Sequence, residues 1–465
     1  MNVPNVLAQD DSERPFHYGF YTATQATLHG TTPFWHHANT YGRVPSQSRA
    51  SSLTGVRGEF PYRTWRGVDW AAGAELTALI SDVQNTTHFT QLYGALQYQA
   101  LRLRIGRFYH TVGGPYESLS MGSMMIGHNA TPIPKIELST PDFFNIPLSE
   151  GRLQAQVYWS EGQLEANRHI PSARLHQKAL HLRAIVGNVR IIGGLIQSLQ
   201  WGGENRPDGW SQYRDILFSP KGGGGENTVA AYEAGVELLL DEWEFQAHRQ
   251  FFMEDWIGLF LRSPWDGIWS VGAQRSPDSS KWIDGVQYEF MNTIQQDALP
   301  GLPEGRAGYY THSTYRSGWT YHSNVIGNPL IRNPQYRSSV HTLDETPNTM
   351  VIAHHLGVEG TPTTRISYEA RLTYSRNYGI CENQVREGTC RFGSSDTVPS
   401  DLEDRRIPRS QLRQDQYATL LDARYLLSEA YGFRLRSSVA VDWGEFDDTQ
   451  VGLMLGLQWD GTVSF

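Results

Sequence analysis

Long runs in which apolar and polar residues alternate are the feature of this sequence that most constrains its fold. In residues 451–465 the odd positions are mostly large and apolar, whereas the even positions are mostly small or polar. The same alternation recurs at 67–81, 365–376 and 433–443. Because successive side chains of a β-strand point to opposite faces, each run predicts a strand with one apolar and one polar face.

The length of these runs separates two kinds of β-protein. Strands of soluble proteins most often have about five or six residues, and these runs are longer. A tilted strand that crosses a bilayer needs about 9–11 residues, with aromatic residues near its ends, and several runs end in Trp or Tyr, such as Trp443 and Trp459. The sequence therefore favours an all-β, transmembrane antiparallel β-barrel over a soluble β-sandwich whose polar face is exposed to solvent.

Eighteen such segments can be delimited. They are 17–29, 52–63, 67–81, 88–98, 101–109, 118–128, 151–160, 178–187, 189–201, 228–240, 242–252, 267–275, 284–294, 350–358, 364–376, 416–429, 432–444 and 450–465. An even number of strands lets both ends of the chain lie on the periplasmic side of an outer membrane. We therefore expect one barrel domain over 1–465, with 1–16 as a periplasmic N-terminal segment.

The connections sort by length once strand directions are assigned. The long ones fall on the extracellular side, at 30–51, 161–177, 202–227, 253–266, 295–349 and 377–415. The short ones fall on the periplasmic side, near 64–66, 99–100, 188, 241, 276–283, 359–363 and 430–431. One long periplasmic connection, 129–150, is an exception, and we expect it to form short helices or a plug.

Composition excludes other classes of protein. No run of 18 apolar residues exists, which excludes an α-helical membrane protein, and the net charge of −9 argues against a nucleic-acid binder. The mean hydropathy of −0.46 is compatible with a barrel, because each lipid-facing residue is averaged with a polar lumen neighbour. The N-terminal segment has no visible secretory signal. If the chain is exported, as its strand pattern suggests, we expect that the leader has been removed, and we expect a monomer.

Three residues carry expectations about export and assembly. Cys381 and Cys390 are nine positions apart in a predicted extracellular connection, and a disulfide between them is the favoured interpretation, with two free thiols as the alternative. Phe465 ends the last predicted strand, and we expect it to serve as the signal read by the outer-membrane assembly machinery.

Catalytic and metal-binding motifs are missing from the sequence. It has no G-x-S-x-G, Walker or H-E-x-x-H motif, and the adjacent His354 and His355 would point to opposite faces of a strand. We therefore expect no enzyme activity, no cofactor and no metal. Adjacent His322, Ser323 and Asn324 leave a surface hydrolase as a remote alternative, because a catalytic triad is recognised by spatial geometry rather than adjacency.

Aromatic and polar residues of the predicted extracellular connections suit a sugar ligand. Sugar rings pack on aromatic faces, and their hydroxyl and carboxylate groups take donors such as Arg. The candidates are Trp35, His36, Tyr41, Trp201, Trp210, Trp256, Trp265, His312, Tyr315, Arg316, Trp319 and Tyr321. Several of these rings could instead fill a loop core or a membrane girdle.

A set of arginines falls on predicted lumen faces. They are Arg102, Arg104, Arg183, Arg190, Arg365, Arg371, Arg434 and Arg436, with Asp69, Glu75, Glu369, Asp422 and Asp442 as possible partners. These arginines predict either a track for an anionic polymer or a salt-bridged network that fills and stiffens the barrel. The presence of both positive and negative side chains on the same face favours the network.

Several stretches together resemble the Wzi-like capsule assembly protein family of bacterial outer membranes. They are TTPFWHHANTYGR (31–43), MGSMMIGHNATPIPKIELS (121–139), ARLHQKALHLR (173–183), GGLIQSLQWGG (193–203) and YYTHSTYRSGWTYHSNVIGNPL (309–330). The resemblance implies an outer-membrane barrel of eighteen strands, outer loops that cap the lumen, and small helical elements near the periplasmic mouth.

The resemblance also implies a lectin-like role. The expected partners are capsular polysaccharide or exopolysaccharide, outer-membrane lipid and lipopolysaccharide, with no nucleic acid. A porin or polysaccharide export channel of the same architecture is the alternative, because eighteen strands enclose a lumen wide enough for sugars.

Overall fold

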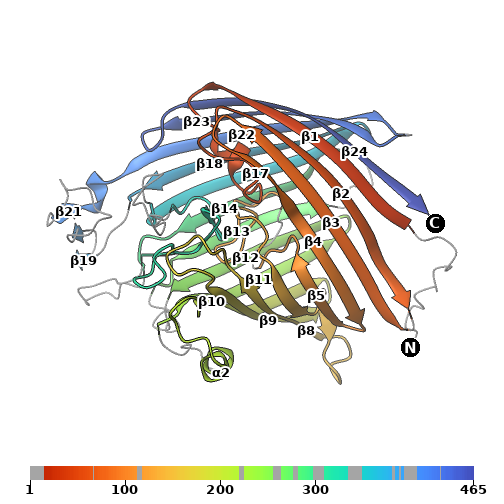
Figure 1. The fold of residues 1–465 in the computed structure, drawn as a ribbon, viewed down its shortest axis with the longest axis horizontal. Coiled ribbons are helices and arrows are strands. Elements are labelled where there is room, and N and C mark those ends of the chain that lie inside the picture. Colours follow the sequence, from red (N-terminus) through yellow and green to blue (C-terminus); the bar gives the residue numbers. More distant parts are fainter. Residues whose placement is uncertain are drawn as a thin grey trace.

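The computed structural model describes a closed antiparallel β-barrel of eighteen strands (Figure 1). The described residues are 15–65, 67–112, 118–218, 225–254, 263–275, 281–296, 308–332, 348–379, 383–386, 389–391, 406–429 and 431–464. Consecutive strands pair around the barrel, and β1 (Pro15–His29) closes it by pairing with β24 (Gln450–Ser464) over most of its length. The predicted transmembrane barrel is confirmed.

The remaining strands of the barrel wall follow in chain order. They are β2 (Ala50–Trp65), β3 (Val68–Ser81), β4 (Asn85–Tyr98), β5 (Leu101–Arg107), β6 (Lys135–Ser139) continued by β7 (Phe144–Asn145), β8 (Leu153–Gln163), β9 (Arg174–Val186), β10 (Val189–Trp201), β11 (Asn227–Leu240), β12 (Trp243–Glu254), β13 (Gly267–Arg275), β14 (Lys281–Asn292), β17 (Val351–Thr363), β18 (Ile366–Asn377), β22 (Gln414–Ser428) and β23 (Phe433–Gly444).

Short elements lie within the connections. They are α1 (Phe34–His37), α2 (Trp210–Phe218), the hairpin of β15 (Thr320–Tyr321) and β16 (Asn324–Val325), the small sheet of β19 (Asn383–Arg386), β20 (Thr389–Arg391) and β21 (Arg406–Pro408), and a 3-10 helix at Arg409–Gln411. None of the helices in the described residues is long and apolar enough to cross a membrane.

The outer surface of the barrel is apolar, as the alternation predicts. Leu92 and Leu96 of β4 and Ile105 of β5 are exposed outward, whereas Arg102 and Arg104 point into the barrel. Aromatic rings gather on the wall at both ends of the strands, where they form stacked series such as Tyr374–Tyr417–Trp443 and Phe433–Trp459. An apolar band between aromatic belts is the surface that a bilayer requires.

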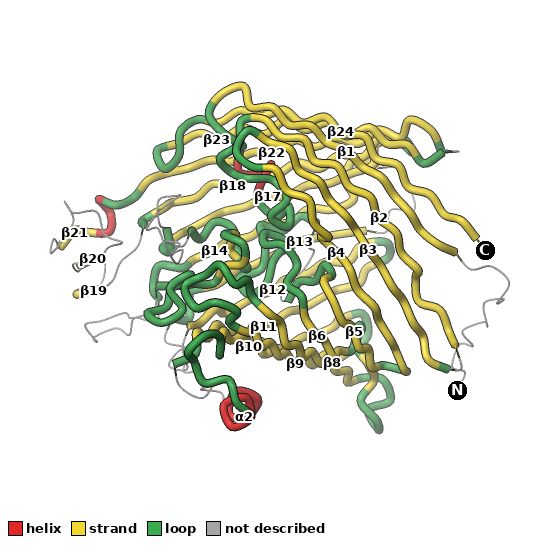
Figure 2. The backbone as a smooth tube through the Cα atoms, in the orientation of Figure 1, coloured by secondary structure: helices red, strands yellow, loops and turns green. Residues whose placement is uncertain are grey.

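The two ends of the barrel differ in their connections. The start of β1 and the end of β24 lie at one end, here called the terminus end, where the connections are short. The long connections lie at the other end, here called the long-connection end, together with the short turns at 82–84 and 445–449 (Figure 2). The predicted sorting of connections by length is confirmed except around the sixth strand. The helices correct another expectation, because α1 and α2 belong to connections of the long-connection end rather than to the periplasmic mouth.

The predicted sixth strand, 118–128, is wrong. That place in the barrel is taken by β6 and β7, which pair with β8, and the turn that follows at 146–152 is short. Met121, Met124 and Met125 are buried on every side because residues 118–134 lie inside the barrel. The predicted periplasmic connection 129–150 is therefore also wrong, and the plug-forming stretch enters from the long-connection end, after β5.

Three segments fill the barrel at its long-connection end, and we call residues 33–43, 118–134 and 308–332 the plug. Inward carboxylates of the wall accept hydrogen bonds from plug backbone amides: Asp442 Oδ2 from Phe34 N (2.5 Å), Glu289 Oε2 from Met121 N (2.7 Å). In the same way, Glu254 Oε2 accepts from Tyr310 N at 3.0 Å. The hydrophobic core is thus inside the barrel, where plug and wall meet.

The plug segments also bond to one another. Tyr310 Oη donates to the carbonyl oxygen of Met124 at 2.6 Å, and Trp319 Nε1 donates to that of Met125 at 3.1 Å. Both aromatic side chains are fully buried. Two segments that are almost 200 positions apart in sequence therefore fold as one unit.

A charge on the outer face should prevent assembly of the barrel. Leu455 lies near the middle of β24 with its side chain exposed to the outside, and Leu455→Arg places a cation there at a cost of about 2–4 kcal/mol. We expect less folded barrel, measured as heat-modifiable electrophoretic mobility. The matched control, Leu455→Met, should assemble normally, and equal amounts of folded Leu455→Arg would contradict a lipid-facing position.

Candidate functional site

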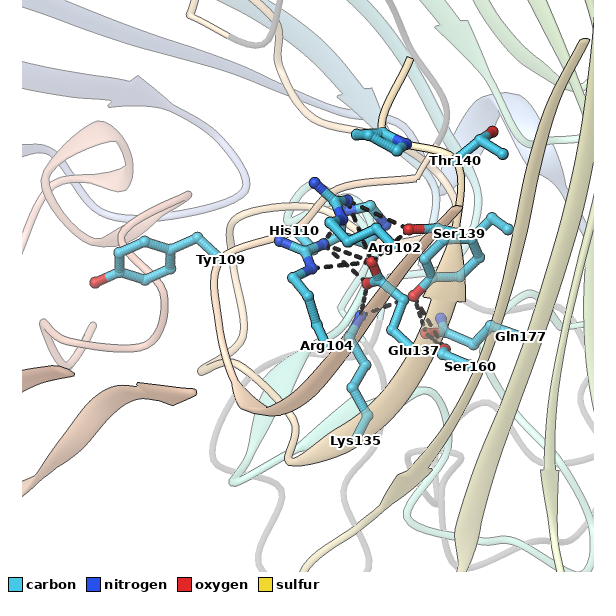
Figure 3. A network of polar contacts seen from close by, with 12 residues as sticks. Arg102, Arg104, Tyr109, His110, Lys135, Glu137, Ser139, Thr140, Ser160 and Gln177 are labelled. Atoms are coloured by element: carbon cyan, nitrogen blue, oxygen red, sulfur yellow. Dashed lines mark hydrogen bonds and ion pairs between the residues drawn. The ribbon is translucent and has the colours of Figure 1, made fainter. Parts of the chain in front are cut away.

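The inward arginines mostly form ion pairs with wall carboxylates, as the network interpretation predicts. Arg436 Nε lies 2.6 Å from Asp422, Arg434 Nη1 3.1 Å from Asp460, and Arg190 Nη1 3.3 Å from Glu237. Arg371 Nε is 2.5 Å from Glu369, and Arg102 and Arg104 converge on Glu137 (Figure 3). Arg183 instead donates to Gln154 Oε1 at 2.7 Å.

One of these arginines is misplaced in the sequence interpretation. Arg365 lies in the exposed turn between β17 and β18, with Nε 4.0 Å from Glu429, and not on the lumen wall. Two of the expected acidic partners have other roles. Glu75 pairs with Arg43 of the plug at 3.4 Å, and Asp442 holds the backbone of Phe34.

The terminus end of the lumen contains a large polar cavity. Its volume is about 880 Å³, and its wall includes Arg57, Glu59, Tyr93 and Asp460. Arg57 donates to Asp460, and Tyr93 Oη donates to Glu59 at 3.0 Å. Arg57 is therefore ion-paired and Glu59 is hydrogen-bonded, and the side chains of the Arg57–Asp460 pair are partly exposed to solvent.

Most of the aromatic candidates from the connections are buried, which corrects the expectation that they face a ligand. Trp35, His36, Trp201, Tyr315, Trp319 and Tyr321 have little or no exposed surface. Trp35 Nε1 donates to Thr373 and its ring lies beside His355, whereas His36 Nε2 bonds to Ser438. Most of these side chains pack inside the barrel, but Trp201 instead packs against Tyr213 and Ile216 of α2 in a separate cluster. Sequence alone does not separate such buried rings from rings on the surface.

Other candidates keep exposed surface at the long-connection end. Trp210 of α2 is 74% exposed and Trp265 is 59% exposed, and Arg316 is also exposed. His312 is half-buried, with Nδ1 accepting from the backbone amides of Thr314 and Tyr315. Tyr41 packs on Tyr109 with a centroid distance of 4.0 Å. Trp256, Cys381 and Phe465 lie outside the described residues, and Cys390 is on β20.

Hydrogen bonds join three connections into one surface beside the exposed candidates. The backbone N of His169 donates to Ser317 Oγ at 2.8 Å, and Glu204 N donates to the carbonyl oxygen of Pro171 at 3.0 Å. Tyr315 Oη donates to the carbonyl oxygen of Gly202 at 3.2 Å. The described parts of the connections 164–173, 202–226 and 293–350 are therefore held together.

This junction gathers positive charge, and we call His169, Arg206 and Arg316 the basic rim. Burial, with Arg316 and Arg206 nearby, lowers the pKa of His169, so its imidazole is neutral at neutral pH. Both arginine side chains are exposed. Sequence reasoning did not find His169, because nothing in a short polar connection marks one His as the neighbour of two distant arginines.

Below the rim, a buried arginine fixes the junction. Arg168 Nη1 donates to the carbonyl oxygen of Thr320 at 3.0 Å and Nη2 to that of Gly318 at 3.2 Å. Gln200 Nε2 also donates to the Gly318 carbonyl oxygen, at 2.9 Å. Side chains of the wall and of a neighbouring connection therefore set the position of the backbone that carries Arg316.

The sequence matches the family described as capsule assembly protein Wzi over residues 14–335. The chain belongs to the Wzi capsule assembly family. The matched range contains all three plug segments and the basic rim, so the family resemblance stated from sequence is confirmed. No curated protein matches the chain.

Solved structures share the fold at low identity. The structure of Wzi, an outer membrane protein involved in group 1 capsule assembly in Escherichia coli and a carbohydrate-binding β-barrel, matches with a TM-score of 0.57 and 15% identity, over 95% of this chain and 83% of that chain. OccK5 of Pseudomonas aeruginosa matches with a TM-score of 0.49 and 9% identity, over 96% and 98%. OprD of Pseudomonas aeruginosa matches at 0.46 and 9%, over 97% and 93%.

The residues considered for a hydrolase form a turn in this Wzi-family barrel. His322 and Ser323 connect β15 to β16 with positive φ angles of 47° and 69°, and both are exposed. Asn324 Nδ2 donates to the carbonyl oxygen of His322 at 3.2 Å. The three residues thus belong to a tight hairpin. Within the described ranges, no group of three or more His, Cys, Asp or Glu side chains is placed to hold a metal ion.

The buried and exposed tryptophans should respond differently to truncation. Trp319→Ala leaves a large cavity in the plug, and we expect it to destabilise plug folding by about 3–5 kcal/mol. Hydrogen exchange of backbone amides in 308–332 should become faster. Trp210→Ala is the matched control, and its exchange should equal that of the unmodified chain. Unchanged protection in Trp319→Ala would contradict a structural role for this ring.

Proposed function

We propose that this chain is a non-enzymatic outer-membrane barrel that binds capsular polysaccharide or exopolysaccharide and aids its attachment, assembly or export at the cell surface. The long-connection end is then extracellular, and the termini are periplasmic. The basic rim carries the proposal, because three connections hold His169, Arg206 and Arg316 together on that end. Membership of the capsule assembly family supports it.

The chemistry of the rim suits a polysaccharide. Planar guanidinium groups donate two parallel hydrogen bonds to a carboxylate or to neighbouring hydroxyl oxygens. The neutral imidazole of His169 has both a donor and an acceptor nitrogen for sugar hydroxyl groups. Trp210, on the connection that carries Arg206, presents an exposed ring on which the apolar face of a sugar can pack.

The plug argues against the alternative of an open porin. It fills the lumen at the long-connection end with fully buried side chains, including Trp319, Tyr310 and Met124. A hydrated path for sugars through the barrel would need the plug to move away from the wall carboxylates that hold it. A binding role at the surface needs no such movement.

Loss of the rim arginines should weaken polysaccharide binding. Removal of a hydrogen bond to a charged group costs about 1.5–3 kcal/mol, so Arg206→Gln with Arg316→Gln should weaken binding at least about tenfold. Biolayer interferometry with purified barrel and surface polysaccharide from the source bacterium measures the affinity. The control, Arg152→Gln, removes an exposed arginine near the terminus end and should bind normally. Absence of binding by the unmodified barrel, or unchanged binding by the double variant, would refute the proposal.

Conductance in planar bilayers separates the plugged barrel from a channel. We expect no steady large openings from the full chain, because the plug occupies the lumen. A variant without 308–332 that retains heat-modifiable mobility should conduct. Steady large openings of the full chain would favour the export channel.

A further inference from the structure

A buried group of cations on the lumen wall has too little negative charge beside it. Arg102 and Arg104 of β5 and Lys135 of β6 lie 3.2, 2.8 and 3.9 Å from carboxylate oxygens of Glu137. Figure 3 shows these side chains converging on Glu137. The exposed fractions are 15%, 13% and 7% for the cations and 0% for Glu137. Three basic side chains around one carboxylate leave an excess of positive charge that little water screens.

The pairing of β5 with β6 fixes this cluster. Arg104 lies opposite Glu137 and Arg102 lies opposite Ser139 in the antiparallel register. Because inward side chains alternate with outward ones, Lys135 and Glu137 share the inward face of β6, whereas Ile136 and Leu138 are exposed outside. The excess of positive charge is therefore built into the register of β5 and β6.

Two nitrogen atoms beside the cluster are buried without a hydrogen-bond acceptor. They are Nε of Arg102 and Nε2 of His110. His110 Nδ1 lies 3.4 Å from Nη2 of Arg104, and because a guanidinium only donates, Nδ1 accepts and the proton of the neutral ring is on Nε2. Burial, with Lys135, Arg104 and Arg102 nearby, holds the pKa of His110 well below its usual range, which keeps the ring neutral. Both orphaned atoms are thus N–H donors.

The two residues that carry these donors line a cavity. Its volume is about 110 Å³, and Arg102, His110, Ser139, Thr140, Gln156 and His181 are among the residues that line it. The lining contains no Asp or Glu among the described residues. His181 is already paired with Glu233, at 2.6 Å, so that carboxylate is not available to balance the arginines. The space is large enough for a small oxyanion with a few water molecules.

We propose that this cavity is a binding site for a small oxyanion, whose oxygens accept hydrogen bonds from Arg102 Nε and His110 Nε2. The ligand is either an inorganic anion of the sulfate type or the carboxylate of an acidic sugar. Two or more oxygen acceptors satisfy both donors, and the negative charge offsets the excess at Glu137. The site is on the lumen wall and does not include the basic rim, so it stands independently of polysaccharide binding at the surface.

Equilibrium dialysis of the purified full-length barrel tests the site. Labelled sulfate, glucuronate and glucose are compared at constant ionic strength, made up with a chloride salt. We expect saturable binding of one oxyanion per barrel and no binding of glucose. Stronger binding of sulfate would identify an inorganic anion as the ligand, and competition by glucuronate at lower concentration would identify an acidic sugar.

Two variants and a control assign the binding to this cavity. Arg102→Met removes one donor. His110→Phe removes the other and keeps a ring against Tyr158, on which His110 stacks at a centroid distance of 4.7 Å. Each should bind the oxyanion at least about tenfold more weakly, whereas Arg190→Met, which removes a lumen arginine paired with Glu237, should bind normally.

Heat-modifiable mobility shows which variants fold, and His110→Phe keeps the test decisive if Arg102→Met does not assemble. No saturable oxyanion binding by the unmodified barrel would overturn the proposal and leave water as the content of the cavity. Equal affinity in folded His110→Phe and in the unmodified barrel would also overturn it.

Discussion

The pairing of β1 with β24 is the constraint on which the rest of this structure depends. In a bilayer no water can satisfy an unpaired backbone group, so a sheet that crosses it must close on itself. Closure of eighteen strands determines which side chains face lipid and which face the lumen. It also creates a lumen too wide for wall side chains to fill alone, and the chain must fill it with segments from its own connections or leave it to water.

The plug meets that need, and the polar lumen wall determines how it is held. Asp442, Glu289 and Glu254 come from three different strands, and each accepts a hydrogen bond from a backbone amide of a different plug segment. A buried backbone N–H without a partner would be costly, so the carboxylates of the wall make an irregular backbone stable inside the barrel. With the plug fixed there, the ends of its segments and the neighbouring connections form the surface on which His169 and Arg316 meet.

The sequence predicts the wall well because burial on one face imposes period-2 alternation. It predicts the plug poorly because the core residues of the plug are buried on all sides. Met121, Met124 and Met125 therefore look like part of a strand, whereas β6, with only Ile136 and Leu138 facing outward between proline-containing stretches, carries a short and weak signal. The candidate site shows the same limit. An aromatic ring in a connection has the same local sequence whether it fills the lumen, as Trp319 does, or is exposed, as Trp210 is. The proximity of His169 to Arg206 and Arg316 can be recognised only once the three connections have been placed in space.

The charges of the lumen differ in their access to water more than in their number. Arg57 and Arg434 share Asp460, but all three side chains are 28–48% exposed, and the large cavity beside them gives room for water that screens the excess charge. The cations around Glu137 are much less exposed, and their mutual repulsion is screened less. Repulsion between arginines that share one carboxylate is thus screened more beside Arg434 than beside Arg102, which is why an extra anion is expected beside Arg102 and not beside Arg434.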